Sequence, residues 1–335
     1  MKRIILIFVF LPFLVWNCSR APEPVHLLGE AQGTYYSILY YDDSSRNFQH
    51  EIDSLLDAFD QSVSLWVPSS IISRVNNNDS TVVLDDSFIG NFQLSMEVSE
   101  KTGGAFDVTV GPLVRAWGFG FDNKKHVNDH IIDSLLQFTG YKKIRIKDGK
   151  IVKDDPRVSV DFNAIAQGYS VDLVGDFLEN KGIDDYLIDI GGEVKASGHK
   201  PGGKLWQIGI EKPAEHQDSD RKLEAVVELK NKSVATSGNY RKFYIENGIR
   251  YSHTIDPTTG RPVRHSLLSA SVIADNTAVA DAYATAFMVM GLEKAKAFLK
   301  ENKNMDAFLI YSDEKGNYQT YATPGFQKYI TKSFE

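Results

Sequence analysis

The chain has 335 residues and a single cysteine, Cys18, which limits how its fold can be stabilised. One cysteine cannot form a disulfide within the chain, so a folded domain must depend on its hydrophobic core. Hydrophobic residues make up 42% of the sequence, which is ordinary for a globular protein. Residues 31–335 are enough to bury such a core, either as one large domain or as two interlocked subdomains.

Two basic residues near the start precede an apolar run from Ile4 to Trp16, which stops just before Cys18. The run is too short to cross a bilayer, and a basic start with a short apolar run is typical of a secretory signal. A cysteine at the end of such a run is similar to a bacterial lipoprotein signal, in which that cysteine is acylated. We therefore predict a lipoprotein signal peptide over residues 1–17, lipidation of Cys18 and a tether over residues 18–30. The alternative is an ordinary signal peptide with an incidental cysteine.

The protein is exported under both interpretations. We expect it on the periplasmic face of a bacterial membrane, namely the inner membrane. The formal charge is −7, from 37 basic and 44 acidic residues. This balance argues against a nucleic-acid partner and against a basic membrane-binding face. Attachment to the membrane would then depend on the lipid alone.

Segments with helical periodicity occur among segments in which apolar and polar residues alternate, as in strands. The two kinds do not follow each other in the regular strand-helix order of a parallel α/β protein. The turn at Asp148-Gly149, between two alternating segments, predicts a hairpin. We expect an α+β fold of mostly antiparallel sheets packed with helices. Helices are expected over 48–59, 87–101, 110–117, 166–181, 275–290 and 293–302. The segments LIDIGGEVKASG, WQIGIEK and AVVELKNKSVATSG are expected to be strands of one sheet.

The segment DNTAVADAYATA places Asp281 and Thr285 four residues apart in a run of small residues. Four residues are about one helical turn, so both oxygen-bearing side chains would project from one face. Such oxygens suit a hard divalent cation. The alternative is a buried helix whose threonine bonds its own backbone and whose aspartate caps a neighbouring element.

Four other local patterns each allow a structural and a functional interpretation. Gly103 and Gly104 permit a close approach of the backbone to a ligand, but they also suit a helix C-cap. The start of the helix after VDFNA could present its backbone to a phosphate or a cation, or it could be a plain N-cap. His253, beside a Pro-Thr-Thr-Gly turn, is a natural proton acceptor near neutral pH, although such histidines are often structural. The ring of Trp66 could stack on a planar ligand or lie in the core.

Taken together and in order, these patterns resemble the ApbE-type flavin transferases, which are FAD:protein FMN transferases. The similar segments are GTYYSI, SLWVPSSIISRVN, GGAFDVTVGPLVRAWGFG, VDFNAIAQGYSVD, DIGGEV, SVATSGNY, HTIDPTTGRPV and DNTAVADAYATA. The resemblance implies an FAD and Mg²⁺ cleft between two interlocked subdomains. It also implies transfer of FMN from FAD to a threonine or serine hydroxyl of an exported flavoprotein, with AMP as the leaving group. Subunits of ion-pumping, flavin-linked redox complexes are the implied acceptors.

By position, the resemblance implies roles for individual residues. The Mg²⁺ ligands would be the carbonyl of Ala164, the carboxylate of Asp281 and the hydroxyl of Thr285, and His253 would be the general base. The implied FAD contacts are Trp66, Asn76, Ala105, Phe106, Asp107, Asp161 and Gln167. A cation would offset the negative charge that opposes attack on a diphosphate, while His253 would accept the proton of the incoming hydroxyl.

Two positions depart from the family pattern: Gln32 stands where methionine is common, and Gln167 stands where lysine is frequent. A neutral amide at 167 would help the phosphates less than a lysine would. Two other functions use the same site. One is a Mg²⁺-dependent FAD pyrophosphatase that releases FMN and AMP, and the other is a non-catalytic FAD-binding lipoprotein.

Overall fold

A large antiparallel sheet is the centre of the computed structural model, which describes residues 23–119, 127–213, 222–239, 243–246 and 249–334. Its eight strands follow the spatial order β1-β2-β5-β6-β9-β14-β15-β16, and each described pair of neighbours is antiparallel. These strands are β1 (Pro24–Ala31), β2 (Thr34–Tyr41), β5 (Tyr186–Ile190), β6 (Glu193–Ser197), β9 (Lys232–Gly238), β14 (Leu267–Ala274), β15 (Asp306–Ser312) and β16 (Tyr318–Ala322). The α+β class and the antiparallel pairing expected from the sequence are confirmed.

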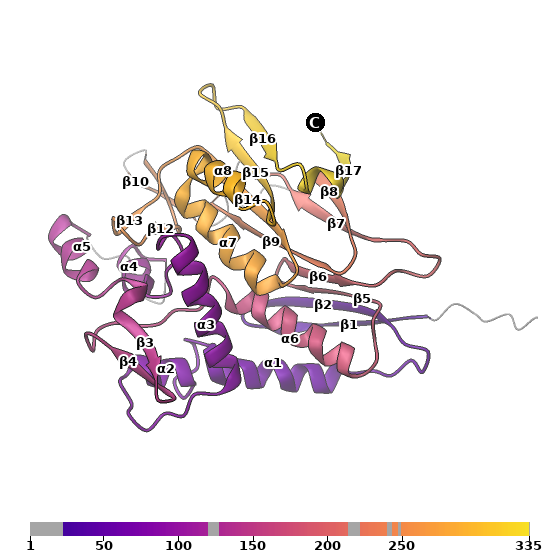
Figure 1. The fold of residues 1–335 in the computed structure, drawn as a ribbon, viewed down its shortest axis with the longest axis horizontal. Helices are drawn as coiled ribbons and strands as arrows, with labels where there is room; N and C mark the ends of the chain where they lie inside the picture. The colour runs from indigo at the N-terminus through magenta and orange to yellow at the C-terminus, as the bar shows by residue number, and fades with distance from the viewer. Residues whose placement is uncertain (1–22, 120–126, 214–221, 240–242, 247–248, 335) are drawn as a thin grey trace, which may run out of the picture.

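Helices cover one face of this sheet, as Figure 1 shows for α6 and α7. The helices are α1 (Gln49–Val63), α2 (Ile71–Asn76), α3 (Asp86–Lys101), α4 (Gly111–Ala116), α5 (Asp129–Leu136), α6 (Ala166–Asn180), α7 (Thr277–Met290) and α8 (Leu292–Glu301). Alanines on α7 pack with β9, β14 and α3 in the largest hydrophobic cluster. Small residues on this helix therefore let it lie close to the sheet, as the sequence predicts.

The opposite face of the sheet is covered by a second sheet, β17-β8-β7. Its strands are β7 (Trp206–Glu211), β8 (Leu223–Leu229) and β17 (Ile330–Ser333). Trp206 is fully buried between the two sheets, where it packs with residues such as Val194 and Ile273. The expectation that WQIGIEK and AVVEL belong to the same sheet as LIDIGGEVKASG is wrong. Alternation identifies a strand with one buried face, but it does not say which partner the strand has.

Residues 24–30, which were expected to belong to a tether, instead form most of β1. Every residue from Pro24 to Ala31 is paired with β2, and Leu27 is buried. Proline is tolerated at the start of an edge strand, because its missing N–H faces away from the ladder. Gly29 leaves room for the ring of Tyr36, whose Cζ would lie 2.5 Å from an added Cβ. The predicted signal peptide and Cys18 lie outside the described residues, and no described helix is long and apolar enough to cross a membrane.

Three short hairpins complete the fold. They are β3 (Ile144–Lys147) with β4 (Lys150–Lys153), β10 (Phe243–Glu246) with β11 (Ile249–Ser252), and β12 (Ile255–Asp256) with β13 (Arg261–Pro262). The Asp148-Gly149 turn of the first hairpin is confirmed, with positive φ at both residues as its tight geometry requires.

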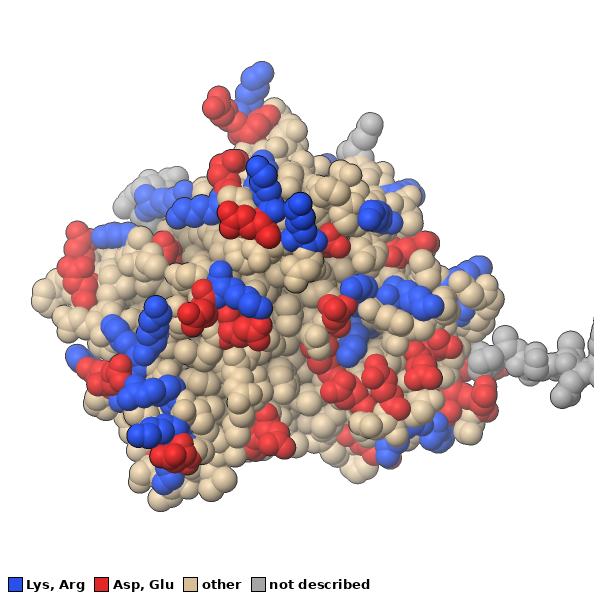
Figure 2. All heavy atoms as spheres, in the orientation of Figure 1, with Lys and Arg blue, Asp and Glu red and all other residues tan. Residues whose placement is uncertain are grey.

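Charged side chains of both signs are spread over the face seen in Figure 2, and lysines and arginines gather over the β3–β4 hairpin at the lower left. Arg145 pairs with Asp154 at 2.6 Å, and Arg157 pairs with Asp155 at 2.6 Å. The hairpin is therefore a mixed, ion-paired surface rather than a continuous basic one.

Candidate functional site

The predicted cation ligands lie where α6 crosses α7. Gly168 makes this crossing possible, since an added Cβ would lie 2.6 Å from the carbonyl oxygen of Thr277. The backbone amide of Gly168 donates to Oδ2 of Asp281 at 3.2 Å, and the Asp281 side chain is only 6% exposed. The alternative in which Asp281 caps a neighbouring element is thus confirmed in part, because it accepts a first-turn amide of α6.

Asp281 nevertheless keeps an unused oxygen. Within the described part of the chain no hydrogen bond reaches its Oδ1, whereas buried carboxylates normally use both oxygens. The amide of Gly168 donates to Asp281, and no described backbone bond joins it to the carbonyl of Ala164, its partner in a regular helix. Ala164 lies two residues before the start of α6, and no described backbone hydrogen bond reaches its carbonyl.

Thr285 follows one helical turn after Asp281 on α7, as the four-residue spacing predicts. Its Oγ1 lies 3.0 Å from Oγ of Ser237 on β9, so the side chain is held by the sheet rather than by its own helix. The carboxylate, hydroxyl and carbonyl oxygens are the ligand types that a hard divalent cation prefers. The described residues contain no group of three or more His, Cys, Asp or Glu that could hold a metal, so a cation at this crossing would rest on this mixed oxygen set.

Electrostatics also favour a cation at this crossing. Burial raises the pKa of Asp281 from 3.8 to about 7, and the Gly168 amide only partly opposes the change. Burial, and then the charge of Asp281, raise the pKa of Glu193 well above its ordinary value. Asp281 is buried and Glu193 is half-buried, and two such neighbouring carboxyl groups resist ionising together unless a positive charge joins them.

Without a cation, Asp281 should make the protein less stable as the pH rises. The stability linked to its proton is fully present below about pH 3.8 and is lost as the pH rises through about 7, because the folded state holds a proton that the unfolded chain releases. At about 1.36 kcal/mol per pKa unit, the loss is about 4 kcal/mol at most. In EDTA, Asp281→Asn should therefore lose less of its melting temperature between pH 5 and pH 8 than the natural protein does. Asp133→Asn, an exposed change on α5, is the control, and equal pH slopes for Asp281→Asn and the natural protein would contradict the assignment.

Gln167 joins the first turn of α6 to the turn between β5 and β6. Its Nε2 donates to the carbonyl of Ile190 at 2.8 Å and to the carboxylate of Glu193. Both amide protons are thus used inside the protein. Gln167 directly precedes Gly168, whose amide binds Asp281, and its own donors position the hairpin turn and Glu193.

The predicted FAD residues near Asp161 form a second group. Asp161 accepts the amide of Asn163 at 2.9 Å in a local turn before the helix. The alternative of an N-cap by Asp161 or Asn163 is wrong, because α6 begins after Ile165 without a side-chain cap. Burial raises the pKa of Asp161, partly opposed by the charge of Arg115 on α4. Asn76 bonds both backbone groups of Val160, at 2.7 and 2.8 Å, which fixes the chain just before Asp161.

Gly103 and Gly104 end α3 as the C-cap alternative predicts, with positive φ at both and amides that donate to the carbonyls of Glu100 and Ser99 at 3.1 and 2.8 Å. Asp107 is buried and accepts hydrogen bonds from the amide and hydroxyl of Thr109, at 2.7 and 2.6 Å, and from the amide of Tyr141 at 2.7 Å. Phe106 is 2% exposed and belongs to the core, while Ala105 is half-buried. A ligand contact at these positions would therefore fall to the backbone or to Ala105.

Trp66 is the most exposed tryptophan described, at 70%, so the interpretation that places its ring in the core is wrong. It lies in the loop between α1 and α2, which Ser70 fixes by donating its hydroxyl to the carbonyl of Ser64 at 2.7 Å. Stacking on a planar ligand is the remaining interpretation of this exposed indole.

His253 stands at the end of the β10–β11 hairpin, and its ring packs edge-on against Phe119 with centroids 6.3 Å apart. The turn that follows is fixed to α4, because Nε1 of Trp117 donates to the carbonyl of Gly260 at 2.8 Å. The other end of α4 reaches Asp161, whose Oδ2 would lie 3.2 Å from a Cβ on Gly111. Helix α4 thus links the His253 turn to the segment 161–164, where the two groups of site residues meet.

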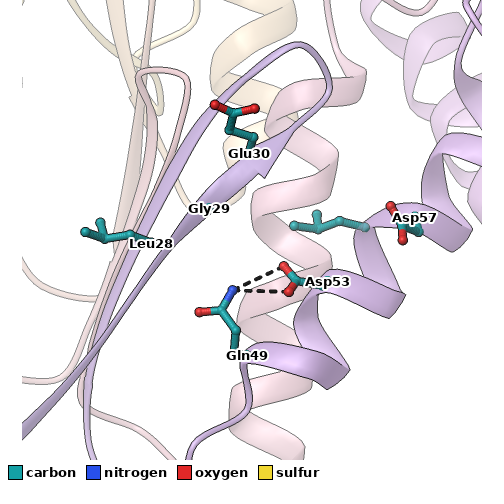
Figure 3. A pocket seen from close by; sticks show the side chains of 7 residues that line it. Leu28, Gly29, Glu30, Gln49, Asp53 and Asp57 are labelled. Carbon is teal, nitrogen blue, oxygen red and sulfur yellow. Dashed lines mark hydrogen bonds between the residues drawn. The ribbon is translucent and has the colours of Figure 1, made fainter.

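The cavity in Figure 3 is separate from this site. It has a volume of about 420 Å³ and lies between β1 and α1, lined by Leu28, Gly29, Glu30, Gln49, Asp53, Leu56 and Asp57. None of the predicted site residues lines it. Its three carboxylates therefore have no part in the cation site or in the His253 turn.

Three residues of the site were not singled out from the sequence. Glu193 and Ser237 occur inside the matching segments DIGGEV and SVATSGNY, so those segments were the available signal. Asp172 accepts the amides of Thr277 and Ala278, at 3.0 and 2.9 Å, and caps α7 from α6. These partners are 26 to 106 positions apart, which no local pattern reveals.

The profile of the ApbE family matches residues 32–309. The FAD:protein FMN transferase of Vibrio cholerae is 35% identical to this chain and covers 95% of it and 96% of its own length. The FAD:protein FMN transferase of Escherichia coli K12 is 32% identical and covers 94% and 93%. Among solved structures, the apo form of the Pseudomonas stutzeri flavinyl transferase ApbE superimposes with a TM-score of 0.84 at 31% identity, covering 94% of this chain and 99% of that one. The flavin transferase ApbE of Vibrio cholerae gives 0.81 at 34% identity, covering 92% and 99%.

Proposed function

The chain belongs to the ApbE family and is an FAD:protein FMN transferase, and we propose that it transfers FMN to a threonine or serine hydroxyl of an exported flavoprotein. The observation that carries this proposal is the crossing of α6 and α7. There a buried carboxylate, one oxygen of which accepts no described hydrogen bond, is followed one helical turn later by the hydroxyl of Thr285, and Ala164 lies just before the start of α6.

We assign Mg²⁺ to this crossing, held by the carboxylate of Asp281, the hydroxyl of Thr285 and the carbonyl of Ala164. The mixed oxygen set and the raised pKa of Asp281 support the assignment. When bound, the cation would orient the diphosphate of FAD and offset its charge. On the protein side, Gly168 holds Asp281 in place through its amide.

His253 accepts the proton of the acceptor hydroxyl in this proposal. The hydroxyl oxygen then forms a bond to the phosphorus of the FMN part, and the bond from that phosphorus to the bridging oxygen breaks. The electron pair leaves with AMP, which later takes a proton. The edge-on packing of Phe119 and the fixed turn at Gly260 support a positioning of the imidazole that costs little reorganisation.

We further propose that the enzyme is exported and attached to the periplasmic face of a bacterial membrane through a lipid on Cys18. The short apolar run before Cys18 supports this. The proposed acceptors are subunits of ion-pumping, flavin-linked redox complexes. The reaction needs a protein substrate in the compartment to which the enzyme is exported, and such subunits would supply one.

An incubation with FAD, Mg²⁺ and a candidate acceptor tests the reaction. We expect the acceptor to gain the mass of FMN less one water and to remain fluorescent after denaturation, with one AMP formed for each modified acceptor. Release of free FMN and AMP with an unmodified acceptor would indicate a pyrophosphatase instead. Unchanged FAD after long incubation with several acceptors would indicate a flavin-binding protein without activity.

A further inference from the structure

Two pairs of hydroxyl groups fix α7 to β9, one at each end of the helix segment that carries Asp281. Oγ1 of Thr277 lies 2.8 Å from Oγ of Ser233, and Oγ1 of Thr285 lies 3.0 Å from Oγ of Ser237. Eight residues of helix advance about 12 Å, and four residues of strand advance about 13 Å. The two elements therefore match in length between the pairs, with Asp281 midway along the helix.

The two pairs differ in their surroundings. Thr277 and Ser233 are fully buried, and the Thr277 hydroxyl also contacts the capping carboxylate of Asp172 at 3.0 Å. Thr285 and Ser237 are only half-buried and lie at the open end, one turn beyond Asp281. The first pair belongs to the helix cap, while the second lies beside the proposed cation ligands.

A hydroxyl has one proton and two lone pairs. A threonine that gives a lone pair to a cation must direct its proton elsewhere, because the cation repels it. Among the described residues, Oγ of Ser237 lies 3.0 Å from this hydroxyl and can accept its proton. Ser237 itself is held in the ladder, where it pairs with Ala270 of β14.

We infer that Ser237 is a positioning residue for the cation site, an inference that rests on the proposed function. It accepts the proton of the Thr285 hydroxyl and so turns the lone pairs of that oxygen toward the space beside Asp281. Groups that orient a metal ligand in this way typically change metal affinity by about 10-fold to 100-fold when they are removed.

Binding of Mg²⁺, followed by calorimetry and by the Mg²⁺-induced shift in melting temperature, tests this inference on the folded chain with and without FAD. We expect Ser237→Ala to weaken Mg²⁺ binding by about 10-fold, with kcat at saturating Mg²⁺ within about twofold of the natural value. Ser237→Thr keeps the hydroxyl and should retain most of the affinity. Ser233→Ala is the matched control, since it removes the equivalent hydroxyl at the other end of α7 and should lower the melting temperature without changing the affinity for Mg²⁺.

An unchanged Mg²⁺ affinity in Ser237→Ala would overturn the inference, as would an equal loss in Ser237→Ala and Ser233→Ala. If Ser237→Ala does not fold, Ser237→Cys, with its weaker acceptor, serves in its place and should show a smaller loss in the same direction. If the natural protein itself binds no Mg²⁺ by either method, then the proposed cation site is wrong, and that failure is distinct from a loss confined to the Ser237 variants.

Discussion

Replacing Asp281 with asparagine will abolish Mg²⁺-dependent transfer of FMN while leaving the protein folded. The amide oxygen of asparagine can still accept the Gly168 amide, so the crossing of α6 and α7 keeps its hydrogen bond. The charged ligand, however, is lost. A cation that offsets phosphate charge supplies several kcal/mol to the transition state, and each 1.36 kcal/mol is a factor of ten in rate. We therefore expect the rate to fall by about 10³-fold or more, measured as modified acceptor per minute at several Mg²⁺ concentrations.

The comparison variant is Asp133→Asn, which removes one exposed carboxylate from α5 and should transfer FMN at the natural rate. Circular dichroism and the melting temperature show whether each variant is folded. Transfer by folded Asp281→Asn at a rate near that of the natural protein would refute the assignment of the cation to α7.

His253→Ala should lower turnover far more than it lowers the affinity for FAD. General-base assistance is typically worth about 10² to 10⁴ in rate, and a residue that acts only on the acceptor proton leaves the binding of FAD almost unchanged. We expect kcat to fall within that range, while the dissociation constant for FAD, measured by fluorescence, changes by about threefold at most. Added imidazole should restore part of the activity, because it can occupy the space left by the ring.

His130→Ala is the control, since this histidine is exposed on the neighbouring helix α5. A parallel loss of FAD binding and turnover in His253→Ala, with no rescue by imidazole, would instead make His253 a flavin-contacting or structural residue.

Local patterns predicted most of the elements. The helices around Asp281 and Gln167 and the Asp148-Gly149 hairpin are confirmed, because periodicity and turn chemistry act over a few residues. Two predictions are wrong because a long-range partner decides the outcome: the sheet to which β7 and β8 belong, and the tether assignment of β1. The strand β1 was assigned to a tether because its proline and glycine are typical of loops, yet β2 pairs with all of it.

Only the part of the site that lies within one helical turn was predictable from the sequence. The spacing of Asp281 and Thr285 placed both on α7, but it could not show that Ser237 reaches Thr285 from 48 positions away. The sequence also does not show which polar atoms of the implied FAD contacts are already hydrogen-bonded within the protein. Asn76 and Asp107 both bind backbone groups of other segments. Hydrogen bonding between distant segments decides which side chains remain available to a ligand.

Since β1 begins at Pro24, residues 19–23 are all that lies between the sheet and Cys18. A chain of this length reaches at most about 20 Å when fully extended. With the proposed lipid on Cys18, the start of β1 would stay within about 20 Å of the membrane surface. Acceptors anchored in the same membrane would therefore be held close to the enzyme.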